Sequence, residues 1–124
     1  MSTILIVDDS ATMRALVRQA LEPDGHTVLE APNGAAALAA LEHTPADVVI
    51  TDVIMPEMDG LGFTRRLRAN EALRRIPVLI LTTEATPAMK ERGRTAGATG
   101  WLVKPFHPET LRQSVRRVLA ERAA

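Results

Sequence analysis

The chain contains no cysteine, and it carries no excess of charge of either sign. The lack of cysteine excludes disulfide bonds, thiolate zinc sites and thiol nucleophiles. The 15 lysine and arginine residues balance 15 aspartate and glutamate residues. This balance argues against a protein whose main task is to bind a nucleic acid or an anionic membrane. We therefore expect neither of these among its partners.

Long apolar segments are absent as well. The longest apolar runs are far shorter than the ~18 residues needed to cross a bilayer. Met1-Ser2-Thr3 leads directly into a short strand-like run, without the basic segment and long apolar stretch of a signal peptide. A cytoplasmic location is expected. The length fits a single domain over 1–124 with a core of its own.

A regular alternation of short apolar runs and helix-like stretches occupies the whole chain. The apolar runs predict five strands, over Thr3–Val7, Thr27–Glu30, Val48–Thr51, Val78–Leu81 and Gly100–Val103. The stretches between and after them predict five helices: one after a Ser10 cap, one from Asn33 to about Glu42, one after an Asp59 cap, one over Pro87–Ala96 and one from Pro108. Five βα units predict an α/β fold, with a doubly wound five-stranded parallel sheet flanked by five helices in a flavodoxin-like three-layer sandwich.

Four of the predicted strands end in reactive polar residues: Asp8-Asp9, Asp52, Thr82-Thr83 and Lys104. In a parallel sheet the C-terminal ends of all strands share one edge, and ligands of open α/β sheets bind there. Each residue taken alone could be a cap or a solvated loop residue. Independent structural uses would, however, scatter them. We therefore expect three carboxylates, a hydroxyl and an ammonium group to converge on one site.

These residue types suit a divalent cation and a phosphoryl group. Several carboxylates close together repel each other, and a hard dication such as Mg²⁺ relieves that repulsion. Lys104 supplies a point charge for a phosphoryl group, to which Thr82 can donate a hydrogen bond. Carboxylates that form aspartyl phosphates are established nucleophiles. Asp52 is the expected acceptor because its apolar strand should lie near the middle of the sheet, whereas Asp8 and Asp9 are better placed to hold metal and water.

The set of motifs resembles the receiver domain of two-component response regulators, and above all single-domain regulators of the bacterial chemotaxis type. The matching residues are Asp8-Asp9, Asp52, Met55-Pro56, Asp59-Gly60, Thr82 and Lys104-Pro105-Phe106. The resemblance implies the strand order 2-1-3-4-5 and transfer of a phosphoryl group from a histidine kinase or phosphotransfer protein to Asp52. It also implies that Mg²⁺ is ligated by Asp9, Asp52 and the backbone carbonyl of Ile54, with Asp8 nearby. Thr82 and Lys104 would contact the phosphoryl oxygens. The Lys104–Pro105 bond is expected to be cis.

The resemblance further implies how a signal leaves the domain. In the family a threonine or serine on strand four is coupled to an aromatic residue on strand five, which here are Thr82 and Trp101, although Trp101 could also be a simple packing residue. Phosphorylation would shift the face of the predicted helix 87–96, strand 100–103 and last helix, and so change binding to a downstream protein such as a flagellar motor switch. The chain ends about one turn past its last predicted helix, so we expect no output domain. We expect a monomeric signalling protein that catalyses only its own phosphorylation and dephosphorylation.

Two further hypotheses concern side chains around this machinery. Ile54 is apolar where many chemotaxis regulators carry a polar residue, and we hypothesise that it excludes the attacking water and lengthens the phosphorylated lifetime. A partner-binding face could be formed by six basic residues, Lys90, Arg92, Arg94, Arg112, Arg116 and Arg117. A solvated face with Arg117 paired to Glu121 is equally compatible with the sequence.

Competing functions are separated by single positions. A phosphatase of the haloacid-dehalogenase type needs a second aspartate two residues after the nucleophile, where this chain has Ile54. A flavin- or dinucleotide-binding module needs a Gly-rich or Ser/Thr-rich loop after the first strand, where Asp8-Asp9 would repel a phosphate. A receiver that is never phosphorylated is disfavoured by the full set of acidic, hydroxyl and lysine residues. A receiver that is a piece of a larger regulator or hybrid kinase stays open.

Overall fold

The structure is a computed structural model and describes residues 2–123. Its centre is a parallel sheet of β1 (Thr3–Val7), β2 (Thr27–Ala31), β3 (Val48–Thr51), β4 (Val78–Thr82) and β5 (Gly100–Val103). The strand order is β2-β1-β3-β4-β5, as expected, with β3 in the middle. Every pair of neighbouring strands is parallel. The C-terminal ends of β1, β3, β4 and β5 therefore share one edge.

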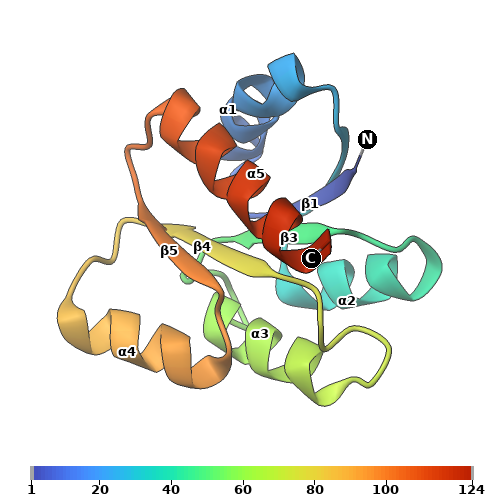
Figure 1. Cartoon of the computed structure of the whole chain (residues 1–124). Helices are drawn as coiled ribbons and strands as arrows, with labels where there is room; N and C mark the ends of the chain where they lie inside the picture. The colour runs from blue at the N-terminus through green and yellow to red at the C-terminus, as the bar shows by residue number, and fades with distance from the viewer. Residues whose placement is uncertain (1, 124) are drawn as a thin grey trace.

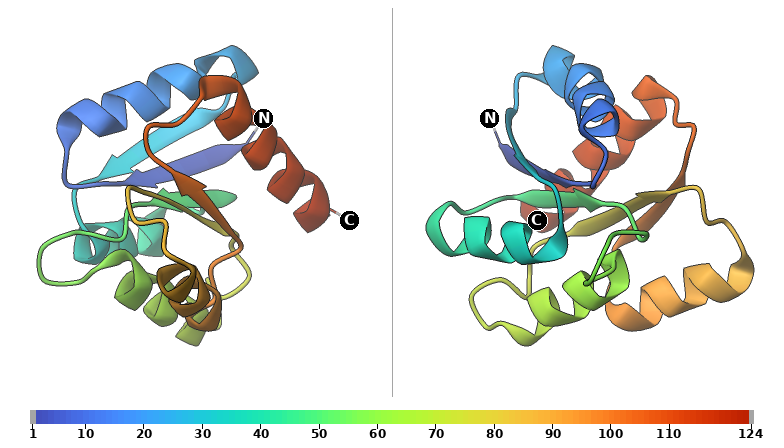
Figure 2. Two further views of the ribbon diagram at one scale, coloured as in Figure 1. Left: turned by 90° about the vertical axis from the view of Figure 1, so that its left-hand side faces the viewer. Right: turned by 180° about the vertical axis from the view of Figure 1, so that it is seen from behind.

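Helices cover both faces of the sheet (Figure 1). They are α1 (Ala11–Leu21), α2 (Gly34–His43), α3 (Gly60–Ala69), α4 (Pro87–Ala96) and α5 (Pro108–Ala123). Figure 2 shows α1 and α5 on one face and α2, α3 and α4 on the other. Two apolar clusters fill the spaces between the layers, one under α1 and α5 and one under the other three helices. The predicted three-layer sandwich is confirmed.

Four of the helices are capped by side chains at the residues where the sequence predicts helix starts. Ser10, Asn33, Asp59 and Thr86 each accept a hydrogen bond from a backbone N–H in the first turn of the following helix. Such caps satisfy donors that have no partner inside the helix. The boundaries of strands differ slightly from the prediction: β2 extends to Ala31, and β4 includes Thr82. Thr82 thus belongs to the sheet rather than to the loop after it.

The α4 helix is held to the domain near its C-terminal end. Its buried residues are Gly93 and Ala96, and Gly97 ends it in the left-handed region with φ of 106°. Arg68 of α3 crosses to this end and donates hydrogen bonds to the carbonyl oxygens of Gly97, Arg74 and Ile76. One guanidinium group therefore ties the end of α4 to the loop that leads into β4. Within residues 2–123, no helix has the length and apolar character required to cross a membrane.

Candidate phosphoryl-acceptor site

Three carboxylates from two neighbouring strands meet at the C-terminal edge of the sheet. Asp8 and Asp9 follow β1, and Asp52 follows β3. Each of these residues offers an oxygen that lies within 4.8 Å of the other two. Asp8 is buried and Asp9 is exposed, so the cluster extends from the protein interior to the solvent. The convergence expected from the sequence is present for all three.

Lys104 completes the cluster from β5, on the far side of β4. Its Nζ atom lies 2.9 Å from Oδ2 of Asp8 and 2.9 Å from Oδ2 of Asp52. Burial acts to lower the pKa of the Lys104 ammonium group, but the hydrogen bonds and negative charges of Asp8 and Asp52 outweigh it, and the pKa lies above its ordinary value. Lys104 is therefore a fixed positive charge between two carboxylates.

Backbone groups orient the two carboxylates that Lys104 contacts. Oδ1 of Asp52 accepts hydrogen bonds from the N–H groups of Val53, at 2.7 Å, and Ile54, at 3.3 Å. Oδ1 of Asp8 accepts one from the N–H of Ser10 at 2.9 Å. In both cases Oδ2 is the oxygen that faces Lys104. The lysine and the strand-end backbone thus fix the acidic side chains from opposite sides.

The loop after Asp52 approaches the acceptor very closely. Gly60 donates its N–H to the carbonyl oxygen of Val53, and a Cβ atom on Gly60 would collide with the carbonyl oxygen of Asp52. Only glycine allows this approach. The Ile54 side chain is 57% exposed beside the acceptor, and the Lys104–Pro105 bond is cis, as the resemblance implies.

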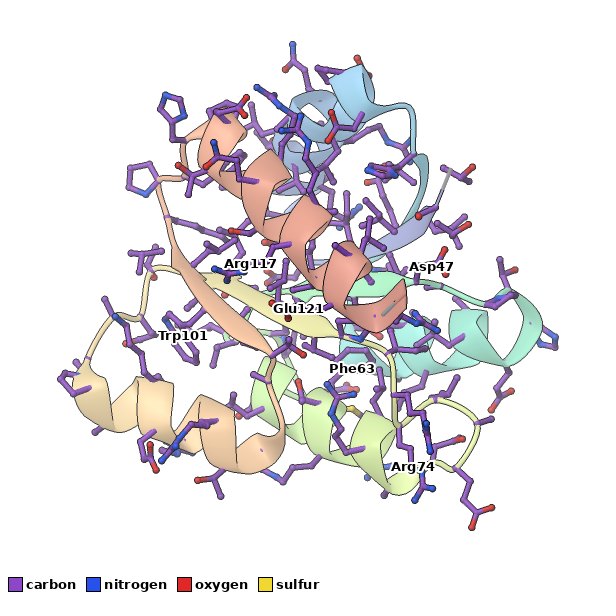
Figure 3. All side chains as sticks on the ribbon, viewed as in Figure 1. Asp47, Phe63, Arg74, Trp101, Arg117 and Glu121 are labelled. Atoms are coloured by element: carbon purple, nitrogen blue, oxygen red, sulfur yellow. The ribbon has the colours of Figure 1, made fainter. Side chains whose placement is uncertain are left out.

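Thr82 and Trp101 are connected through the backbone of Glu84. Thr82 is fully buried, and its Oγ1 accepts a hydrogen bond of 3.4 Å from the N–H of Glu84. The indole Nε1 of Trp101 donates a hydrogen bond of 2.9 Å to the carbonyl oxygen of Glu84. Figure 3 shows Trp101 between β5 and α4, where its ring packs against Gly93. Thr82, the last residue of β4, is therefore linked to Trp101 through a single residue.

Two residues that the sequence did not single out support the site. The Glu84 peptide makes the connection just described. Arg14 of α1 donates a hydrogen bond of 2.6 Å to the carbonyl oxygen of Asp8 and pairs with Glu30 at 3.0 Å. Neither role has a sequence signal, because one uses a backbone peptide and the other depends on how α1 and β2 pack beside β1.

The basic face expected on α4 and α5 needs correction. Arg112 and Arg116 form ion pairs with Glu109, Arg116 also pairs with Asp24, and Arg94 pairs with Glu91. Half of the six predicted cations are therefore neutralised locally. The alternative pair is not formed either: across residues 2–123, Arg117 and Glu121, both labelled in Figure 3, belong to no ion pair.

The carboxylate cluster fits a hard divalent cation. Mg²⁺ takes oxygen ligands, usually one or two carboxylates together with water and phosphate oxygens. Asp9 is exposed and Asp52 is partly buried, and each offers a carboxylate oxygen to the cluster. Lys104 is bonded to both Asp8 and Asp52, so a cation at this cluster would compete with its ammonium group. The arrangement can hold a cation and an incoming phosphoryl group together.

Comparison with known proteins identifies the class of protein that this fold and site define. Residues 4–116 match the response regulator receiver domain, and the chain belongs to this family. Protein PilH of Pseudomonas aeruginosa is 40% identical over 120 residues, which cover 97% of this chain and 99% of that protein. The gliding motility regulatory protein of Myxococcus xanthus is 40% identical over 116 residues, and this chain spans 15% of its length.

Solved structures share the fold. The chemotaxis protein CheY4 of Vibrio cholerae superposes with a TM-score of 0.90 at 44% identity, covering 95% of this chain and 98% of that one. The receiver domain of the sensor histidine kinase PA1611 of Pseudomonas aeruginosa, which has a magnesium ion coordinated in its active site cleft, gives a TM-score of 0.88 at 29% identity over 96% of this chain and 98% of that one.

The family establishes the general function. Receiver domains are signalling proteins rather than ordinary enzymes: they take phosphoryl groups from histidine kinases, act on downstream targets and bind Mg²⁺ in their acidic cluster. The chain is thus a receiver domain of CheY-like response regulators, consistent with phosphoacceptor signalling in chemotaxis or in a phosphorelay. A phosphatase of the haloacid-dehalogenase type is not favoured.

Proposed function

We propose that Asp52 accepts the phosphoryl group and that the chain catalyses this transfer itself. The observation that carries the proposal is the position of Lys104, whose Nζ lies 2.9 Å from Asp52. An Asp52 oxygen attacks phosphorus, an O–P bond forms, and the P–N bond to the donor histidine breaks. The histidine nitrogen leaves with the electron pair and takes up a proton. Lys104 stabilises the negative charge on the transferred oxygens.

Asp9, Asp52 and the backbone carbonyl of Ile54 would hold Mg²⁺, with Asp8 nearby. When bound, the cation neutralises charge on the carboxylates and the phosphoryl oxygens. Asp8 is suited to a supporting role because it is buried and already bonded to Lys104 and to the N–H of Ser10. The exposed Asp9 is suited to direct contact with a cation that enters from solvent.

Phosphorylation would be transmitted through Thr82, Glu84 and Trp101. If the Thr82 hydroxyl turns to a phosphoryl group on Asp52, it gives up its contact with the N–H of Glu84. The carbonyl of the same residue holds Trp101. The indole and the face of α4, β5 and α5 would then shift and change binding to a downstream protein, such as a flagellar motor switch.

The acceptor is tested by incubating the protein with Mg²⁺ and acetyl phosphate and measuring its intact mass. The expected result is the gain of one phosphoryl group, which Asp52→Asn abolishes. Asp59→Asn is a matched control, because it makes the same chemical change at a nearby residue whose carboxylate caps α3. Uptake that persists in Asp52→Asn would show that another residue is the acceptor.

The output step is tested by tryptophan fluorescence. Trp101 is the only tryptophan, so any signal reports on the surroundings of this one indole, which include Glu84 and Gly93. We expect the emission to change when beryllofluoride and Mg²⁺ bind, and we expect Thr82→Ala to reduce that change. An unchanged emission, with binding proven by calorimetry, would count against a switch at Trp101.

A further inference from the structure

The side chain of Asp9 is held less firmly than those of the other two carboxylates in the cluster. Asp8 and Asp52 are each fixed by Lys104 and by backbone N–H groups. Among residues 2–123, the Asp9 carboxylate makes no hydrogen bond and no ion pair. The direction of this carboxylate therefore depends on the backbone that carries it.

The backbone that leads into Asp9 is held by Arg14 of α1. The N–H of Asp8 donates a hydrogen bond of 3.2 Å to the carbonyl oxygen of Ala31 in β2. The carbonyl oxygen of Asp8 accepts one of 2.6 Å from a terminal nitrogen of Arg14. Because this carbonyl and the N–H of Asp9 belong to one planar peptide group, the contact with Arg14 sets the orientation of the peptide from which Asp9 begins.

Glu30 of β2 holds the guanidinium group of Arg14 in this position. Nε of Arg14 lies 3.0 Å from Oε1 of Glu30, and the other oxygen, Oε2, pairs with Arg18 at 2.8 Å. Burial acts to raise the pKa of Glu30, but the hydrogen bonds and charges of the two arginines outweigh it and hold the pKa below its ordinary value. An ionised carboxylate thus helps to fix the guanidinium group that binds the Asp8 carbonyl.

The chemistry of Arg14 is unsuited to direct contact with a cation. A guanidinium group has no acceptor atom that could be a metal ligand, and its positive charge repels a cation. Within residues 2–123, Arg14 forms no ion pair with Asp8, Asp9 or Asp52. Its contact with this part of the chain is made to a main-chain carbonyl oxygen. Any benefit of Arg14 to a cation site must therefore come through the backbone.

We propose that Arg14, held by Glu30, is a positioning residue for the Mg²⁺ site. By fixing the peptide between Asp8 and Asp9, it keeps the Asp9 carboxylate within reach of the cation. The inference rests on the proposed role of Asp9 as a ligand. Outer groups that orient metal ligands commonly affect affinity, because a ligand that is already ordered loses less conformational freedom when the metal binds.

Arg18 offers a matched control on the same helix. It also bonds to Glu30, and it also donates a hydrogen bond to a backbone carbonyl oxygen, that of Val28, at 3.1 Å. Arg14→Met and Arg18→Met therefore remove the same charge, and each removes the same two kinds of contact. They differ in that only the Arg14 contact involves a residue of the carboxylate cluster.

The test is an amide NMR titration of the metal-free full chain with Mg²⁺, which gives the Kd of each variant. Arg14→Met should raise the Kd about tenfold, as is typical when a metal ligand loses an outer partner. Arg18→Met should leave the Kd nearly unchanged. Arg14→Lys, which keeps the charge and a donor, should restore most of the affinity. Without metal, the Asp9 amide signal should move in Arg14→Met and stay in place in Arg18→Met.

The sign of the change in Kd separates positioning from charge. Loss of a repelling charge alone would tighten Mg²⁺ binding, so an equal or lower Kd in Arg14→Met would overturn the proposal. Equal weakening by Arg14→Met and Arg18→Met would do the same, because it would indicate a general loss of structure. If Arg14→Met does not fold, the milder changes Arg14→Gln and Arg18→Gln are compared in the same way.

Asp9→Asn keeps this inference separate from the proposed function. If Asp9→Asn binds Mg²⁺ as tightly as the wild type, Asp9 is not a ligand and the proposed metal site is wrong. If Asp9→Asn weakens binding but Arg14→Met does not, the metal site stands and only the positioning role of Arg14 is wrong. Weakening by both, with Arg18→Met unchanged, is the result that we expect.

Discussion

The indole ring of Trp101 lies directly against the backbone of Gly93 and leaves no room for a side chain there. A Cβ atom on Gly93 would come 2.5 Å from the ring. The hydrogen bond from Nε1 to the carbonyl oxygen of Glu84 fixes the other end of the indole. Glycine within a helix costs about 1 kcal/mol relative to alanine. In α4 this cost is the consequence of accommodating the large aromatic residue on β5.

Gly93→Ala should therefore destabilise the protein, although alanine is the better helix former. We expect a loss of about 1–3 kcal/mol in the free energy of unfolding, as is usual for overpacking. In a Trp101→Ala background the same change should instead stabilise by up to about 1 kcal/mol. Urea unfolding of the four proteins checks this. If Gly93→Ala lowers the free energy of unfolding equally in both backgrounds, contact with the Trp101 ring is not the reason for glycine at position 93.

Arg68→Met should destabilise the domain by about 3 kcal/mol, because it leaves several partly buried carbonyl groups without their donor. The guanidinium bonds to Gly97, Arg74 and Ile76 and is partnered by no carboxylate among the described residues. Burial lowers the pKa of Arg68 from its ordinary value. Hydrogen exchange should increase most at the end of α4. Arg65→Met, on the exposed side of the same helix, should have little effect.

The ion pair between Arg116 and Asp24 should make part of the stability depend on pH. Hydrogen bonding and the charge of Arg116 hold the pKa of Asp24 below its ordinary value of 3.8. A lowered carboxyl pKa gives stability that is present above the ordinary value and lost as the pH falls through the lowered one. Arg116→Gln should thus be less stable than the wild type at neutral pH, and this gap should close below pH 3.8. Arg117→Gln should show no such pH-dependent gap.

Lys104→Met should lower the stability of the domain in the absence of metal and should increase the stabilisation that Mg²⁺ gives. The change leaves Asp8 and Asp52 close together without their shared ammonium group, and like charges destabilise a buried cluster. Removal of the competing cation should also tighten Mg²⁺ binding severalfold. Melting temperatures with and without Mg²⁺ should therefore differ more in the variant than in the wild type. A smaller Mg²⁺ response would contradict the competition.

Ile54→Asn should shorten the lifetime of the phosphorylated state severalfold. Ile54 is 57% exposed next to Asp52, so it is positioned to cover an acyl phosphate there, and an amide in its place can orient water. The decay of the added mass after removal of acetyl phosphate measures the rate. Ile54→Val is the conservative control and should decay like the wild type. An unchanged rate in Ile54→Asn would show that the residue does not exclude water.

Hydrophobic periodicity and cap residues predicted the layers, the five parallel strands and four helix starts, because these depend on neighbours in the chain. The convergence of Asp8, Asp9, Asp52 and Lys104 was predictable for a related reason: parallel strands bring their ends to one edge. The roles of these residues in phosphoryl transfer, and a domain limited to 1–124, stay predictions. Boundaries such as Thr82 within β4 depended on pairing with β5.

The sequence by itself determined the fold class and the chemical composition of the site, since both follow from local patterns repeated along the chain. Only the tertiary structure decided which charges remain free. Arg112 and Arg116 read as part of a basic face, yet Glu109 and Asp24 neutralise them. Only packing reveals that Trp101 requires Gly93, and that Arg68 ties α4 to the loop before β4. These relationships join residues far apart in the chain, and no local pattern encodes them.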